Sequence, residues 1–359
     1  YDVGWVALHS DLINAGKDVN FFLKSCPLGS WSHSHGEQNS FTITAWGEPL
    51  VVSGGYYDWY GSPHHFDFTR QSRSKNTILV NGQGQHYRSR DAKGEIIEFF
   101  TGAGFDLTTG DAGGAYAGKL NQFTRQILYC VPDYFLVVDS LQAPEPSYYN
   151  WLLHTISPGK IDQEKNLVRF SQNGVNLDLQ FLLPASLNYE QTDRYLSQGD
   201  ALTVFKDGEV EPESEYLKQY HMAATTSKPN TQGQFVSVLY PYKEANLSFD
   251  GRENGDLYEV RARGEDRCDL TIFNLKGIAG QLQGEGIEAK GKLASASWQN
   301  DQVKKLFLYQ GNNLILDGTE YLTASNPSTI TVEYLPQGSK LMCRLSDCTI
   351  LAVRLASRP

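Results

Sequence analysis

Short runs of alternating apolar and polar residues, separated by Gly, Asn, Asp or Pro, follow one another along almost the whole 359-residue sequence. An alternation with a period of two is typical of β-strands. The chain also contains 20 Tyr and 17 Phe residues, and aromatic residues of this kind are enriched in strands. Few segments show a helical period. Because the strand candidates are too numerous for a single seven-strand sandwich, we predict an all-β protein built on a large antiparallel two-sheet super-β-sandwich.

A shift in composition at residues 245–255, which are rich in Asn, Asp, Gly and charged side chains, is the best candidate for a domain boundary. Further strand-like runs follow it, and the length of the chain suits two domains. The sequence therefore predicts a β-sandwich domain at residues 1–248 and a smaller β domain at residues 249–359. Since a strand-like run begins already at Gly4, we expect the chain to begin inside a larger protein.

Composition excludes several classes of partner. The formal net charge is -10, which disfavours nucleic acid because affinity for phosphate backbones comes from clustered Lys and Arg. No run approaches the roughly 18 apolar residues of a membrane span, so we predict no membrane partner. The five cysteines lack zinc-type CxxC spacing, and their odd number leaves at least one thiol unpaired. Cys343 and Cys348 are close enough in sequence to form a disulfide, although two buried thiols are the preferred interpretation.

Histidines gather near the N-terminus. His33 and His35 are separated by one residue, and if this segment is an extended strand, both imidazoles project from the same face. About twenty residues later, the turn 54–65 holds several Tyr, a Trp, and the pair His64 and His65. From spacing alone, a His-x-His pair can equally be two hydrogen-bonded histidines that fix a loop.

Five short motifs in the first 85 residues carry a resemblance to a known family. They are Ser32–Phe41, Trp46–Leu50, Ser53–Tyr57, Tyr60–His65 and Asn76–Gln85. This part of the chain resembles the β-sandwich half of the heparinase II/III-like polysaccharide lyases, and among them it is most similar to the exo-acting alginate lyases of polysaccharide lyase family 15. The similarity is dense over residues 4–85 and continues weakly through 151–154.

The resemblance implies a catalytic site. A uronate lyase must offset the charge of the substrate carboxylate, remove the proton on the adjacent carbon, and protonate the leaving oxygen. Imidazoles and phenols suit these tasks. By resemblance, His33 is the active-site histidine of the β domain, and Tyr60 is a tyrosine that lines the substrate cleft. In the family an α/α toroid precedes the β region and carries most of the base and carboxylate-neutralising groups, so this toroid is an expected partner of the chain.

The candidates for substrate binding are polar or aromatic side chains near these two. An Arg fork suits a uronate carboxylate, and aromatic rings can stack on sugars, although solvated arginines and packed aromatic side chains are the common alternatives. The predicted substrate-binding residues are His35, Tyr57, Trp59, His64, His65, Arg70, Arg73 and Asn76.

The sequence departs from its relatives at a metal site. Several heparinase-like lyases hold a structural zinc through a His, Asp, His set, and the matching positions here are His35, Ser53 and Lys75. A hydroxyl and an ammonium do not replace a carboxylate and an imidazole as zinc ligands. We therefore predict no zinc at this position and no other cofactor, and the Lys75 ammonium can stand in for the metal cation. Glu37, where relatives often carry Asp, is expected to orient other groups rather than to catalyse.

These expectations combine into a polysaccharide lyase that cleaves a uronic-acid polymer by β-elimination, most specifically alginate and from the chain end. The chain is expected to be inactive without its toroid and to act in the periplasm or outside the cell, with a cytoplasmic location as the alternative. A heparin or heparan sulfate lyase is the alternative enzyme; the lack of an evident basic cluster for sulfate disfavours it mildly. A non-catalytic carbohydrate-binding β-sandwich is the alternative from another class.

Overall fold

The computed structural model describes residues 3–55, 60–62, 64–193, 219–344 and 351–354, together with the backbone of the short segments 195–196, 201–202, 205–206 and 209–210. Its contacts divide the chain into two compact units. The first unit comprises Tyr1–Phe99 and Thr108–Lys243, and the second comprises Phe100–Leu107 and Glu244–Pro359. Residues 245–255, the candidate for a domain boundary, include the strand Ser248–Asn254 (β21).

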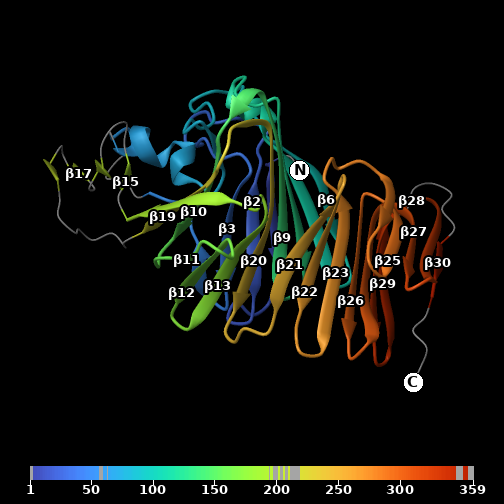
Figure 1. Ribbon diagram of the computed structural model, residues 1–359. Helices are drawn as coiled ribbons and strands as arrows, with labels where there is room; N and C mark the ends of the chain where they lie inside the picture. Colours follow the sequence, from blue (N-terminus) through green and yellow to red (C-terminus); the bar gives the residue numbers. More distant parts are fainter. Residues whose placement is uncertain are drawn as a thin grey trace. The chain divides into compact units, whose positions relative to one another are not determined.

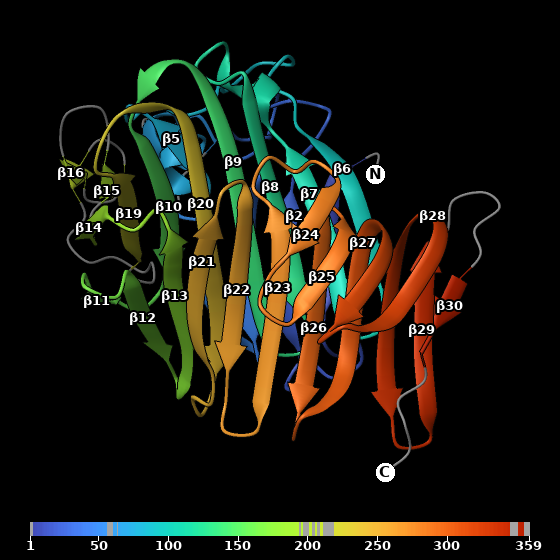
Figure 2. The same cartoon turned by 45° about the vertical axis from the view of Figure 1, so that its right-hand side comes forward.

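The largest sheet of the first unit has eight strands in the order β11-β12-β13-β20-β9-β8-β7-β6. Figures 1 and 2 both show β12, β13 and β20 side by side, although β20 lies far from the other two in sequence. The bounds of the eight strands are Lys160–Asp162 (β11), Leu167–Gln172 (β12), Val175–Leu183 (β13), Asn230–Tyr242 (β20), Tyr134–Ser147 (β9), Gln122–Cys130 (β8), Phe105–Asp111 (β7) and Glu95–Thr101 (β6).

Two four-stranded sheets complete the regular part of this unit, with strand orders β1-β2-β3-β4 and β14-β19-β10-β5. The bounds are Trp5–His9 (β1), Val19–Lys24 (β2), Ser40–Ala45 (β3), Glu48–Val51 (β4), Leu187–Thr192 (β14), Tyr220–Thr226 (β19), Tyr149–Thr155 (β10) and Ile78–Val80 (β5). Two further strand pairs are Tyr195–Leu196 (β15) with Ala201–Leu202 (β16) and Phe205–Lys206 (β17) with Glu209–Val210 (β18).

Alternating burial explains how these strands form one core. In β2 every second side chain is buried, and the same alternation holds over most of β13. The inward faces meet in a single apolar cluster in which Phe41 packs on Phe21 with ring centroids 4.8 Å apart. Burial of alternate apolar side chains on both sheets is the arrangement that the period of two predicts.

The second unit contains one antiparallel sheet of ten strands. Seven follow the order β21-β22-β23-β26-β27-β25-β24, and β28 pairs with β27, β29 and β30. After β21 the strands are Leu257–Arg263 (β22), Arg267–Asn274 (β23), Gly280–Gln283 (β24), Ile287–Gly291 (β25), Leu293–Gln299 (β26), Gln302–Leu316 (β27), Thr319–Leu335 (β28), Gly338–Arg344 (β29) and Leu351–Val353 (β30). Residues 100–107 belong to this unit because Phe100 and Phe105 stack on Phe307.

The predicted all-β, antiparallel sandwich fold is confirmed. In the described residues, helical structure is limited to a π-helix at His65–Thr69 and 3-10 turns at Ser72–Ser74 and Gly113–Tyr116. Within the same ranges, no helix has the length and apolar character that crossing a membrane requires. The expectation of a buried thiol is wrong for Cys343, which is exposed on β29; Cys348 lies outside the described residues, so the pairing of the two stays a prediction.

Candidate functional site

The segment that carries His33 and His35 is a loop between β2 and β3, so the predicted extended strand is wrong. Ser32 adopts a left-handed conformation with φ of 58°, which a strand does not allow. The carbonyls of Ser32 and Ser34 both accept hydrogen bonds from the Nη2 group of Arg70. A buried guanidinium therefore shapes this loop.

Even so, the loop brings the two histidines into one group of rings. The His33 ring contacts the Tyr60 ring at a centroid distance of 4.6 Å, Tyr60 contacts His65 at 4.8 Å, and His65 lies 6.0 Å from His35. His33 is exposed, Tyr60 is 48% exposed, and His65 is buried. We call His33, His35, Tyr60, His65 and Arg70 the histidine–tyrosine cluster. Its exposed part is the imidazole–phenol pair that was predicted to be catalytic.

The buried Arg70 side chain contacts the Tyr60 hydroxyl of the His33–Tyr60 pair. This side chain is only 1% exposed, and its Nη1 group donates to the Tyr60 hydroxyl oxygen at 3.4 Å. The Tyr60 hydroxyl in turn donates to the Ser32 carbonyl at 3.2 Å. Among the described residues, no carboxylate pairs with Arg70. The guanidinium is thus placed to stabilise negative charge on the phenol oxygen rather than to project into solvent.

The protonation state of His65 follows from its contacts. The Gly61 backbone N–H donates to His65 Nδ1 at 2.9 Å, which requires that this nitrogen carries no proton. Burial, reinforced by the Arg70 charge, lowers the pKa of His65 to about 4. His65 is therefore a neutral imidazole that carries its proton on Nε2 at physiological pH.

A second charged group lies beside His35. The buried Lys75 ammonium donates to Ser53 Oγ at 3.0 Å and lies 3.9 Å from one carboxylate oxygen of Glu37, and Lys24 contacts the other oxygen. Burial and the Lys75 charge lower the pKa of His35 to about 3. Burial alone would raise the pKa of Glu37, but the two ammonium groups lower it to about 2. His35 is thus neutral and Glu37 ionised.

Asn76 holds the framework under the site. It is fully buried; its amide donates to the carbonyls of Phe41 and Val52 at 2.7 and 2.8 Å, and its oxygen accepts from the His154 backbone N–H at 2.8 Å. All the hydrogen-bonding groups of its side chain are occupied within the protein. This placement assigns Asn76 to positioning rather than to contact with a ligand.

The remaining predicted binding residues lie in different surroundings. His64 is buried and stacks on Phe68 at 5.4 Å. Arg73 is partly exposed and lines a cavity of about 360 Å³, together with His154, Glu190, Thr192 and His221 from β10, β14 and β19. Tyr57 and Trp59 lie outside the described residues. The structure therefore groups His33, His35, His65 and Arg70 around Tyr60 and places His64, Arg73 and Asn76 in other environments.

Sequence reasoning missed the buried ion pair between Arg125 on β8 and Asp139 on β9. The guanidinium makes two bonds to the carboxylate, at 2.7 and 2.8 Å, and its Nη1 donates to the carbonyls of Asn39 and Asn76 at 2.8 Å each. The Trp151 indole N–H also donates to Asp139 at 2.7 Å. Arg125 thereby links the motif ending at Phe41 to the motif beginning at Asn76. The sequence could have revealed this ion pair only if the pairing register of β8 and β9, which places Arg125 opposite Asp139, were known in advance.

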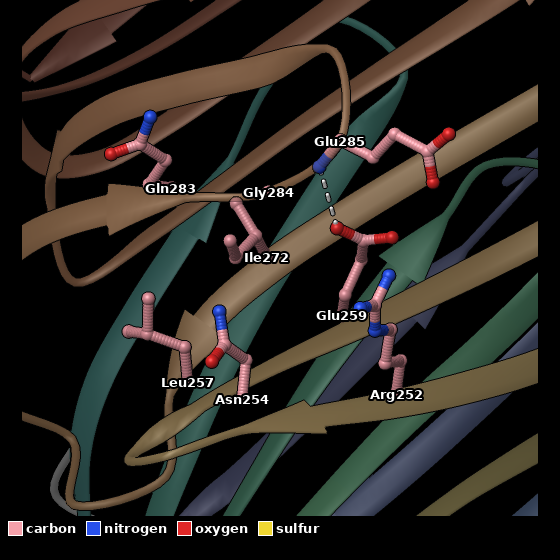
Figure 3. Close-up of a pocket in the computed structure, with 8 residues that line it drawn as sticks. All are labelled: Arg252, Asn254, Leu257, Glu259, Ile272, Gln283, Gly284 and Glu285. Carbon is pink, nitrogen blue, oxygen red and sulfur yellow. Dashed lines mark hydrogen bonds between the residues drawn. The ribbon is translucent and has the colours of Figure 1, made fainter.

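The second unit has a pocket of about 230 Å³ on β21, β22, β23 and the β24–β25 turn. Figure 3 shows Glu259 beneath the turn, accepting a hydrogen bond from the backbone N–H of Glu285 at 3.1 Å. The Arg261 guanidinium also binds Glu259 and Glu285, each at 2.7 Å. We call this the Glu259 pocket. Because its carboxylates already share a cation and it holds no histidine or tyrosine, it lacks the proton-transfer groups of the histidine–tyrosine cluster.

The residues at the expected metal position do not fit a metal ion. Lys75 presents an ammonium, which donates three hydrogen bonds and has no lone pair to offer, and Ser53 presents a neutral hydroxyl that already accepts from it. Within the described ranges, no group of three or more His, Cys, Asp or Glu side chains is arranged to hold a metal. We therefore derive no chemistry through a metal.

Comparison with known proteins identifies the family. The sequence profile described as "Heparinase II/III-like, C-terminal" matches residues 1–268, and the chain therefore belongs to this family. A search of curated protein sequences found no match.

Solved structures with a similar fold include a heparan sulfate lyase, HepC from Pedobacter heparinus, at 20% identity and a TM-score of 0.60 over 76% of this chain and 42% of that one. A heparinase III gene product matches at 14% identity and a TM-score of 0.60, over 76% of this chain and 41% of its own. Another heparinase III structure matches at 15% identity and a TM-score of 0.55, over 83% and 42%. The chain thus spans less than half the length of these structures.

Proposed function

We propose that this chain forms the β-domain wall of the active site of a polysaccharide lyase that cleaves uronic-acid polymers by β-elimination. The observation that carries the proposal is the exposed His33–Tyr60 pair, with a buried guanidinium on the phenol oxygen. Membership of the heparinase II/III-like family supports the same reaction class.

Tyr60 is proposed as the acid. In β-elimination, a base takes the proton from the carbon next to the carboxylate, a double bond forms, and the C–O bond to the leaving sugar breaks. The leaving oxygen needs a proton, and the Tyr60 hydroxyl can turn from the Ser32 carbonyl to supply it. Arg70 then stabilises the phenolate that remains, because its Nη1 group already faces this oxygen.

His33 is proposed to contact the sugar beside Tyr60, where its exposed imidazole can donate a hydrogen bond to the substrate carboxylate. His35, His65 and Arg70 hold the pair in place. Tyr57, Trp59 and Arg73 remain proposed contacts for further sugar units, whereas His64, which was predicted to bind substrate, is buried and is not proposed as a contact. The base that abstracts the proton is expected from an N-terminal α/α toroid, so we propose that the chain is inactive without that partner.

The positive charge around the cluster favours an anionic substrate. Lys24, Arg70 and Lys75 contribute three charges, and Glu37 is the one carboxylate that pairs with any of them among the described residues, which leaves an excess of two. Arg70 and Lys75 are almost completely buried, so they act through their field rather than as a sulfate-binding surface. This arrangement suits a sugar with a single carboxylate and so supports alginate as the substrate; we propose that it is cleaved from the chain end.

A heparan sulfate lyase is the second candidate, because structures of that class share the fold. The alternative from another class, a non-catalytic carbohydrate-binding sandwich, predicts binding without turnover. We also propose a periplasmic or extracellular location, where polymeric uronates would be met.

The test uses the full-length protein that contains this chain. Alginate, heparin and ulvan are each incubated with it, and the near-ultraviolet absorbance of the unsaturated product is followed. We expect turnover of alginate, and a loss on the order of a hundredfold or more in His33→Ala but not in His86→Ala, an exposed histidine outside the cluster. Binding of all three polymers without any absorbance change would exclude the lyase, and turnover of heparin alone would replace alginate by the second candidate.

A further inference from the structure

Lys75 is the most deeply buried ammonium near the histidine–tyrosine cluster. It follows the 3-10 turn Ser72–Ser74, and its side chain is only 3% exposed. Burying an ammonium is costly unless oxygen atoms surround it. Here Ser53, which follows β4, and Glu37, from the loop after His35, supply them at 3.0 and 3.9 Å.

These contacts join three separate pieces of chain. Ser53 lies beyond the end of β4, Glu37 belongs to the loop between β2 and β3, and Lys75 leads toward β5. Lys24, on β2, contacts the other carboxylate oxygen of Glu37 and so completes a cation–carboxylate–cation row. A single positive centre that gathers oxygen ligands from several segments does what a structural metal ion does.

The donor set cannot also hold such an ion. A divalent cation at this position would face the Lys75 ammonium at close range, and the Ser53 hydroxyl carries no charge to offset it. The ammonium and a metal ion are therefore mutually exclusive occupants of the same place.

We propose that Lys75 acts as a structural cation in place of a metal ion. Its contacts with Glu37 and Ser53 tie the His33–Glu37 loop to the segment that follows β4 and make this site independent of metal. Its role is positioning: it holds the loop that presents His33 to Tyr60. The inference is independent of which polymer the protein cleaves, because its readouts are metal content and stability.

The first experiment uses the unmodified protein. Elemental analysis after purification without added metal should find well below one zinc per chain, and a chelator should leave the melting temperature unchanged. Stoichiometric zinc with a fall in melting temperature on chelation would overturn the proposal.

The second experiment removes the cation. Lys75→Met should lower the melting temperature by about 5 °C or more, since it leaves the Glu37 carboxylate with one cation and the Ser53 hydroxyl without its donor. Lys24→Met is the matched control: its ammonium is more exposed, at 13%, and its loss leaves the Lys75 contacts intact, so the shift should be smaller. Equal melting temperatures for Lys75→Met and the unmodified protein would overturn the proposal.

The third experiment exchanges the ammonium for a metal. In the double variant Ser53→Asp/Lys75→His, a carboxylate and an imidazole replace the two groups beside His35. This variant should take up one zinc per chain and gain melting temperature when zinc is added, whereas Lys24→Met should show neither effect. A folded double variant that binds no zinc would show that Lys75 does not occupy a cation position.

Discussion

The histidine–tyrosine cluster and its surroundings hold three cationic side chains, Lys24, Arg70 and Lys75, and one carboxylate, Glu37, which pairs with the two lysines. In the Glu259 pocket, by contrast, the two carboxylates of Glu259 and Glu285 lie beside two guanidinium groups, Arg261, which binds both, and Arg252. The cluster also contains neutral imidazoles and an exposed phenol, and the pocket contains neither. Internally balanced charges stabilise a structure but leave nothing for a ligand. Unbalanced charge beside proton-carrying groups is what a site for an anionic substrate requires.

The largest effect should come from Tyr60→Phe, which removes only the hydroxyl. Turnover of the full-length protein should fall on the order of a hundredfold or more, because the leaving oxygen loses its proton donor. Tyr148→Phe, at an exposed tyrosine of the same unit, is the matched control and should retain normal turnover. If both variants turn over normally while Arg261→Gln in the second unit is inactive, the roles of the two regions are reversed.

A second prediction concerns the buried charge that supports the cluster. Arg125→Met leaves Asp139 buried without its cation and should lower the free energy of unfolding by about 3–5 kcal/mol. The control is Arg169→Met: Arg169 makes the same two-bond contact to Asp178 across β12 and β13, both at 2.7 Å, but its side chain is 46% exposed. That loss should be at most about 1 kcal/mol.

Urea unfolding of the two variants measures the difference. Equal losses of unfolding free energy would mean that burial does not set the strength of these ion pairs. The contrast between the buried Arg125–Asp139 pair and the exposed Arg169–Asp178 pair would then not hold.

The third prediction uses acid. All eight histidines lie in the first unit, and burial is the main cause that lowers the pKa of His35 to about 3, of His65 and His221 to about 4, and of His154 well below its usual value. Between about pH 6.5 and pH 4 the unfolded chain therefore binds more protons than the folded one. Stability of this unit should be complete above pH 6.5 and fall as the pH drops through that window.

The loss of stability of each unit at acid pH is measured by hydrogen exchange of its peptides, corrected for intrinsic exchange rates. Peptides of β3 and β10 should lose protection between pH 7 and pH 5 more than those of β23 and β26, and His65→Gln should reduce the difference. A larger loss of protection in the second unit, which has no histidine, would contradict the prediction that buried histidines cause the acid sensitivity.

Much of the fold was accessible from the sequence because strand signals are local. The strands β6 (Glu95–Thr101) and β10 (Tyr149–Thr155), for example, are rich in the β-branched and aromatic residues that favour strands. The strand β21 was not predicted, because its side chains are nearly all exposed and no apolar alternation marks it.

The site was only partly accessible. The family resemblance marked His33 and Tyr60 as candidates, and the structure places their rings in contact. The way Arg70 and Arg125 act was hidden, because most of their partners are backbone carbonyls from distant segments, which leave no trace in the sequence. The contact between Lys75 and Glu37 likewise depends on how two loops fold.

The smallest effect is expected in the Glu259 pocket. Arg261→Gln removes a cation whose partner Glu285 is mostly exposed, while Glu259 keeps its hydrogen bond from the Glu285 backbone N–H. The loss of stability should therefore be smaller than that of Arg125→Met, and the part that comes from the exposed Glu285 contact should shrink at high salt, because exposed ion pairs are screened. Hydrogen exchange of β22 and the β24–β25 turn measures it, and turnover should remain normal. A loss as large as that of Arg125→Met would show that the balanced pocket holds its unit together as firmly as the buried pair supports the cluster.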